Sequence, residues 1–123
     1  MSLYSQIAID SVMDLKRDID LNPADVWDKN ARALYPNKLS AQNKSCPKSA
    51  FFGLCEEGLV SGVKPGSYTK SKLNKEYALK AVSHLRNDPS LNEEQLWELI
   101  SGKQPNEQMA VVKALYTLGF IVE

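Results

Sequence analysis

The sequence predicts an all-α fold of about six helices, arranged as two tandem three-helix units, and an internal repeat is the main reason. Residues 6–29 align without a gap on residues 76–99, with seven identities in 24 positions. Both tryptophans of the chain, Trp27 and Trp97, fall on aligned positions. Apolar residues in both copies recur at spacings of three and four, which is typical of helices buried on one face. Chance likeness is the alternative interpretation, because a shared period makes amphipathic helices resemble one another.

A second alignment, at an offset of 61 residues, extends the repeat to a third helix in each unit. It places Gly58 on Gly119, and the apolar residues that follow each glycine also align. The first alignment has an offset of 70, so nine extra residues separate the second and third helices of the first copy.

These alignments define the expected organisation of the chain. The repeat units cover residues 4–60 and 74–121, a connector covers residues 61–73, and together they form a single domain at residues 1–123. A lone unit of about 50 residues would bury only a marginal core, so we expect the two units to pack through their apolar faces.

Local residue chemistry marks the helices of the first unit. The first helix is expected at Tyr4–Asp20, where apolar residues form one stripe. The second begins at Asn22 and Pro23, because asparagine caps free amides and proline fits the first helical turn. It ends at Pro36, which cannot continue the helix, and a polar loop follows at residues 37–45.

The third helix of this unit is expected to begin at Pro47, with Ser45 or Cys46 preceding it, and to close at Gly58. The glycines and prolines that follow indicate an irregular connector. A short hairpin near residues 59–69 is the alternative. We prefer the connector because no run of residues alternates long enough to require a strand.

The second unit repeats this order of helices. Its first helix is expected from near Asn74 to the break at Asp88. Asn92 caps the second helix, Asn106 caps the third, and Gly119 closes the third helix.

The composition is that of a globular domain. The chain has 123 residues, of which 43% are hydrophobic and 24% are charged, which excludes a disordered segment. The apolar runs are too short to span a bilayer and no secretory signal is recognised, so no membrane partner is expected. Cys46 and Cys55 fit no disulfide framework and no zinc or redox motif. A reducing cytoplasm is the expected location.

The charge is distributed unevenly, although the formal net charge is zero. Residues 1–28 carry −4, residues 29–75 carry +7 and residues 76–123 carry −3. The acids of the last segment include Glu93 and Glu94, which are expected in a first helical turn, where the helix dipole favours them. The basic middle segment, residues 29–75, is therefore the polarised feature of the chain.

This basic middle segment is the candidate contact for an anion or a nucleic acid. Lysines beside an expected helix start suit a phosphate, because the free amides of that end attract anions. The lysines considered are Lys44, Lys48, Lys64, Lys70 and Lys72. The alternative is a solvated connector, which we prefer because zero net charge is unusual for a dedicated nucleic-acid binder.

Cys46 is the candidate reactive thiol. It lies at an expected helix start between Lys44 and Lys48, and both features favour the reactive thiolate. A dyad with His84, the one histidine, would need the fold to bring the two side chains together. We expect an unreactive cysteine, no catalytic residue, no metal site and no cofactor, since no phosphate-binding loop, metal-ligand spacing or nucleophile elbow is found.

Three stretches carry a family resemblance: residues 46–60, which include Cys-Pro-Lys and Glu-Glu-Gly-Leu-Val, residues 66–69 and residues 74–82. Together they resemble a family of small bacterial proteins of unknown function, and the resemblance covers nearly the whole chain. It implies a bacterial cytoplasmic protein and brings no activity. A weaker likeness, of a helix ending in Gly-Leu-Val before a Gly/Pro turn, is to winged-helix DNA-binding domains. Glu56 and Glu57 at the end of that helix argue against it.

Two functions follow as hypotheses from the sequence. The favoured one is a non-enzymatic protein-interaction module, whose basic middle segment meets a protein partner or packs in a homodimer. The other is a nucleic-acid-binding helical, winged-helix-like domain that uses the five lysines, and its binding would weaken steeply as salt rises. An enzyme acting through Cys46 is the least favoured hypothesis.

Overall fold

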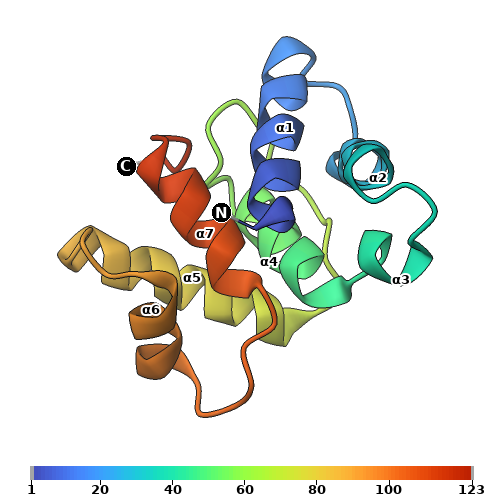
Figure 1. Cartoon of the computed structure of the whole chain (residues 1–123). Coiled ribbons are helices and arrows are strands. Elements are labelled where there is room, and N and C mark those ends of the chain that lie inside the picture. Colours follow the sequence, from blue (N-terminus) through green and yellow to red (C-terminus); the bar gives the residue numbers. More distant parts are fainter. Residues whose placement is uncertain (1, 123) are drawn as a thin grey trace.

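The structure of this chain, a computed structural model, describes residues 2–122, and these residues form helices without a strand (Figure 1). The helical segments are α1 (Leu3–Arg17), α2 (Pro23–Leu34), α3 (Leu39–Gln42), α4 (Ser45–Glu56), α5 (Lys72–Asn87), α6 (Glu93–Ile100) and α7 (Gln108–Thr117). The segment α3 is a single turn, and the other six are longer helices. The predicted all-α class with about six helices is therefore confirmed. Within residues 2–122, no helix combines the length and the apolar character that crossing a membrane requires.

The starts of α2 and α6 follow from side-chain capping, as predicted. The Asn22 side chain accepts the Ala24 amide at 2.8 Å, and Pro23 occupies the first turn of α2. The Asn92 side chain accepts the Gln95 amide at 2.8 Å, and the Gln95 side chain accepts the Asn92 amide at 2.9 Å. These bonds satisfy amides that a helix leaves free at its amino end.

The two central helices are α4 and α7, which contact each other and are surrounded by the other long helices. The helix α1 packs against α2 and α7, while α5 packs against α4, α6 and α7. The first helix of each expected unit thus lies against the third helix of the other unit. Figure 1 shows α2 and α3 on one side of the molecule and α6 on the opposite side. The largest fully buried side chains come from both halves and include Trp27, Phe51, Leu85, Leu96 and Leu115.

A short antiparallel contact joins the segments that follow α4 and α7. Val60 pairs with Ile121, and the flanking bonds run from Ser61 N–H to the Phe120 carbonyl and from Val122 N–H to the Leu59 carbonyl, both at 2.8 Å. The hairpin considered near residues 59–69 is therefore wrong, since residue 60 pairs with residue 121 and not within the connector.

The connector after this contact is fixed by one carboxylate. Glu56 Oε1 accepts the amides of Tyr68 at 2.9 Å and Thr69 at 3.2 Å, and Glu56 Oε2 pairs with the Lys75 ammonium. The pKa of Glu56 is lowered, first by the bond from Lys75 and then by the two amides. Gly53 lets α4 and α5 approach closely, because a Cβ at this position would meet the Lys75 backbone at 2.8 Å. The amides that a hairpin would use are thus already bonded to Glu56.

Four features of the helices differ from the sequence-based expectation. The helix α1 ends at Arg17 and not near Asp20. The expected polar loop at residues 37–45 contains α3, whose Gln42 side chain donates to the Tyr35 carbonyl at 2.8 Å. The helix α4 begins at Ser45, so Cys46 lies inside its first turn. The helix α7 begins at Gln108 and not after Asn106, because Gln108 Oε1 accepts the Asn106 amide and Glu107 adopts a left-handed backbone with φ of +72°.

Several contacts recur at the offsets found in the sequence. Asp18 and Asp88 end α1 and α5 with similar backbone angles, and each carboxylate accepts the amide two residues on, at 3.1 Å. Gly58 and Gly119 follow α4 and α7 with φ of +72° and +77°. These correspondences describe local geometry, and the duplication of the sequence stays a prediction.

Candidate functional site between α6 and α7

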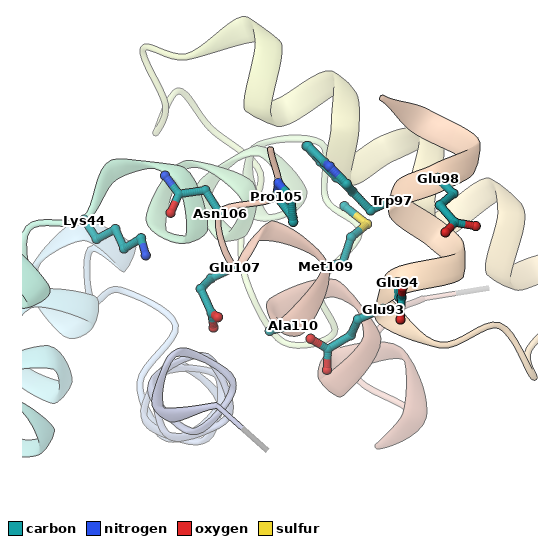
Figure 2. A pocket seen from close by; sticks show the side chains of 10 residues that line it. All are labelled: Lys44, Glu93, Glu94, Trp97, Glu98, Pro105, Asn106, Glu107, Met109 and Ala110. Carbon is teal, nitrogen blue, oxygen red and sulfur yellow. The ribbon is translucent and has the colours of Figure 1, made fainter. Parts of the chain in front are cut away.

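A pocket of about 470 Å³ lies between α6 and the amino end of α7 (Figure 2). One part of its lining is apolar, and another part is acidic with a single lysine. The lining residues are Lys44, Glu93, Glu94, Trp97, Glu98, Pro105, Asn106, Glu107, Met109 and Ala110. Because this volume lies in the range of ligand-binding pockets and combines apolar with charged walls, it is the candidate functional site.

The apolar wall is built around Trp97. Its indole makes a T-shaped contact with Tyr77 of α5, with ring centroids 5.0 Å apart, and its Nε1–H donates to the Lys103 carbonyl at 2.6 Å. Figure 2 shows Pro105 and Met109 beside this indole. Trp97 and Met109 are 6% and 4% exposed, so they present edges to the pocket while most of each side chain is packed.

Four glutamates supply the acidic part of the lining. Glu93 and Glu94 occupy the first turn of α6, and Glu98 lies four residues after Glu94 on the same face. Glu107 precedes α7 and has the left-handed backbone described above. In Figure 2 the carboxylate of Glu107 lies between Lys44 and Glu93.

These glutamates carry negative charge that the surrounding residues do not neutralise. Among residues 2–122, none of the four forms an ion pair. Oε2 of Glu107 is buried and has no hydrogen-bond partner in the same part of the chain. The pKa of Glu93 is raised, first by burial and then by the neighbouring charge of Glu107. The arrangement therefore favours a cation from outside the chain.

Lys44 is the one basic residue of the lining, and its ammonium is engaged elsewhere. Its Nζ lies 5.6 Å from the centroid of the Tyr4 ring, a cation–π distance. The Tyr4 hydroxyl donates to the Ala41 carbonyl at 2.9 Å. Burial, followed by Tyr35 and Glu107, raises the pKa of Tyr4 to about 12. Lys44 therefore borders the acidic pocket without an ion pair to its carboxylates among residues 2–122.

The five lysines of the expected anion contact lie in different surroundings. Lys44 borders the acidic pocket, and Lys48 pairs with Asp28 at 3.4 Å. Lys64 and Lys70 are exposed on the connector, and Lys72 lines a hollow of about 340 Å³ that also contains Glu56 and Glu76. Two of the five thus face acidic groups of the chain itself, and a third shares its hollow with acidic residues.

Cys46 and Cys55 lie in the same helix, α4, and differ in burial. Cys46 is half-buried, and no hydrogen bond joins it to His84 among residues 2–122. Cys55 is buried in the core, as predicted, and this burial raises its pKa. The residues that the structure describes contain no group of three or more His, Cys, Asp or Glu side chains placed to hold a metal ion.

A second hollow, of about 540 Å³, lies beside Arg86 and Val122. Its charged group is already bonded, because the Arg86 guanidinium donates to the Val122 carbonyl at 2.7 Å. The pocket between α6 and α7 is smaller, but its four glutamates form no ion pair among residues 2–122, so it has the stronger chemical character of the two.

The acidic pocket is absent from the sequence-based predictions. Glu93 and Glu94 are predicted there only as acids favoured by the helix dipole, and Glu98 and Glu107 carry no prediction. One signal was present: Glu94, Trp97 and Glu98 are spaced by three and four residues, which places two acids beside a tryptophan on one helical face. The contribution of Glu107 comes from the path of the α6–α7 loop, which no local spacing reveals.

Comparison with known proteins identifies a family. Residues 1–122 match a family described as a family of unknown function (DUF6979). No curated protein and no solved structure matches the chain. The family resemblance expected from the sequence is confirmed.

Proposed function

This chain belongs to a family of unknown function, DUF6979, so we propose a function from its pocket and not from the family. It acts as a non-enzymatic protein-interaction module, and its partner is a protein with a basic docking segment. That segment binds at the acidic pocket between α6 and α7, and not at the basic middle segment considered from the sequence.

One observation supports this proposal above the others: four unpaired glutamates border an apolar wall within a single pocket. Apolar surface supplies affinity in protein interfaces, while complementary charge selects the partner and speeds its association. A basic peptide would bring positive charge to carboxylates that lack it and aliphatic surface to Trp97 and Met109. An acidic or phosphate-bearing partner would be repelled by the same four groups.

The nucleic-acid alternative has weaker support. Its lysines lie in different surroundings, and Lys48 is already paired with Asp28. Lys44 lies beside carboxylates that repel phosphate. Lys64, Lys70 and Lys72 form no ion pair among residues 2–122, so a nucleic acid would have to bind mainly through these three lysines.

Fluorescence anisotropy with labelled ligands of equal length tests the proposal. The ligands are a lysine-rich peptide pool, a glutamate-rich pool, an uncharged pool and a DNA duplex. We expect binding of the lysine-rich pool alone, and weaker binding by the double variant Glu93→Gln/Glu107→Gln. The control variant is Glu76→Gln, which lies on α5 outside the pocket and pairs with Lys80 at 3.0 Å.

Two outcomes would contradict the interaction function. One is equal binding of all three peptide pools, or of none. The other is tight, salt-sensitive binding of the duplex that is lost when Lys64, Lys70 and Lys72 are changed to glutamine.

A further inference from the structure

We infer that the pocket between α6 and α7 takes one lysine side chain of the partner protein, whose stem lies along Trp97 and Met109 and whose ammonium lies between Glu93 and Glu107. This inference rests on the proposed function and deepens it, because it names the anchoring group. It would also assign a role to the buried, unpartnered oxygen of Glu107.

The dimensions and walls of the pocket suit a long side chain with a charged end. A volume of about 470 Å³ exceeds what a single lysine side chain occupies, so the chain of the partner can approach the mouth. Lysine places its aliphatic stem on apolar surface and keeps its ammonium at the polar end. Here the apolar surface is Trp97, Pro105 and Met109, and the polar end is the glutamate pair.

The charge of the pocket favours a cation at the glutamate pair. Four carboxylates line it against one ammonium, and that ammonium lies over the Tyr4 ring. A buried carboxylate oxygen without a partner is costly, and an incoming N–H donor removes that cost. The pKa of Glu93 is raised for a related reason, because burial and the negative charge of Glu107 both disfavour its ionised form.

The first half of the chain contains a lysine at the aligned position of the sequence. At the two sequence offsets, Met109 aligns with Lys48, and Glu98 aligns with Asp28. Lys48 and Asp28 form an ion pair at 3.4 Å between α4 and α2. In the second half α7 brings a methionine to this position, so the acids of α6 keep no lysine of their own. A lysine from the partner would supply the missing group.

Lysine fits this pocket better than arginine. Guanidinium groups gain much of their affinity by stacking on an open aromatic face. Trp97 is 6% exposed and packs against Tyr77, so little of its aromatic face is open for stacking. A compact ammonium with three donors can instead bond to both Glu93 and Glu107.

The inference is tested by nuclear magnetic resonance with a short capped peptide that has a single central lysine. The probes for comparison carry acetyl-lysine or arginine at that position, and n-pentylamine represents a free amine. The indole N–H signals of Trp97 and Trp27 serve as reporter and internal control, because Trp27 is fully buried in the other half. We expect the lysine peptide to shift the Trp97 signal and leave the Trp27 signal in place.

Three variants sharpen this test. Glu93→Gln, in the first turn of α6, should weaken the binding of the lysine peptide about tenfold, a loss of about 1.4 kcal/mol. Met109→Lys supplies an internal ammonium like Lys48 and should abolish the shift, with circular dichroism as the check of folding. Asp28→Asn alters the corresponding pair in the other half and should leave binding unchanged.

Each contrary result has its own meaning. Equal shifts from lysine and acetyl-lysine peptides, or tighter binding of the arginine peptide, would overturn the lysine anchor. Pentylamine that binds as tightly as the peptide would assign the pocket to free amines and overturn the inference as well. If the lysine-rich pool still binds in the anisotropy assay, these results overturn the lysine anchor alone and the interaction function stands. If the lysine-rich pool does not bind, both the anchor and the interaction function are wrong.

Discussion

The two tryptophans occupy aligned positions of the sequence, but their surroundings differ. Trp27 is fully buried, with Phe51 and Phe52 of α4 at centroid distances of 5.2 and 6.3 Å. Trp97 faces no aromatic residue of α7, because Val112 and Lys113 stand at the aligned positions. The Lys113 ammonium instead donates to the Pro89 carbonyl at 2.7 Å. The first tryptophan is enclosed by its own half, whereas the second borders an open pocket.

The two tryptophans also differ in the charge of the residues around them. Beside Trp27, the first turn of α2 carries Pro23 and Ala24 where α6 has two glutamates, Asp25 is its one acid, and Asp28 has its partner Lys48. Beside Trp97, the aligned residues of α6 are three glutamates without an ion pair among residues 2–122. Aligned positions of the sequence thus hold a filled core at one tryptophan and an acidic, open pocket at the other. This contrast is the basis of the proposed function.

Alanine at each tryptophan tests the contrast with the largest expected effect. Trp27→Ala should lower the free energy of unfolding by about 4 kcal/mol, because it leaves a cavity that the aromatic neighbours cannot fill. Trp97→Ala should cost about 1 kcal/mol less, since its site already opens to solvent. Urea unfolding followed by circular dichroism measures both. Equal losses would show that the two sites do not differ in packing.

The two glycines after α4 and α7 give the next comparison. Gly58→Ala and Gly119→Ala should each cost about 1–2 kcal/mol, because both glycines have a positive φ. The Gly58 variant should be the less stable, since its Cβ would meet Pro65 Cγ at 3.1 Å while that of Gly119 would meet nothing within 4 Å. Thermal unfolding ranks the two, and a less stable Gly119 variant would contradict this geometry.

Removing one aligned acid from each half tests the charge contrast. Asp28→Asn should destabilise the protein by less than about 1 kcal/mol, because it breaks a partly exposed ion pair with Lys48. Glu98→Gln should be neutral or slightly stabilising, since it removes charge from an already acidic pocket. Chemical unfolding of both variants provides the comparison. A larger loss for Glu98→Gln would mean that Glu98 has a partner of its own.

The smallest effect concerns pH. The pKa of Glu93 is raised in the folded state, so the folded protein holds this proton more tightly than the unfolded chain. As pH rises above the ordinary value of 4.5 and through the folded pKa, ionised Glu93 therefore lowers stability. Glu93→Gln should gain stability relative to the wild type over this interval. The neighbouring variant Glu94→Gln is the matched control, and an equal gain there would contradict the role of burial.

Local chemistry allowed much of the helical architecture to be predicted from the sequence. Capping by Asn22 and Asn92 and the closing glycine Gly119 depend on adjacent residues, so their positions were correct. The start of α7 was wrong because it depends on a distant contact. The Gln108 side chain, buried in the core, donates to Asn74 at 3.1 Å and accepts the Asn106 amide.

The candidate site was less accessible to sequence reasoning than the helices. The basic middle segment stood out through its net charge, yet the fold spreads its lysines and pairs Lys48 with Asp28. The acidic pocket joins Glu93 to Glu107 across a loop, and only the folded chain brings them together. The net charge of a sequence segment therefore predicted poorly which charged side chains lie together in the fold.

The antiparallel contact between residues 59–61 and 120–122 has a consequence for the order of events during synthesis. Ribosomes release a chain from its amino end, so the segment after α4 emerges well before the strand-like segment that it pairs with. The helix α1 is likewise synthesised well before α7, against which it packs. A nascent chain stalled ahead of residue 108 would hold an exposed apolar face on α1, and chaperones that recognise such faces would find it there.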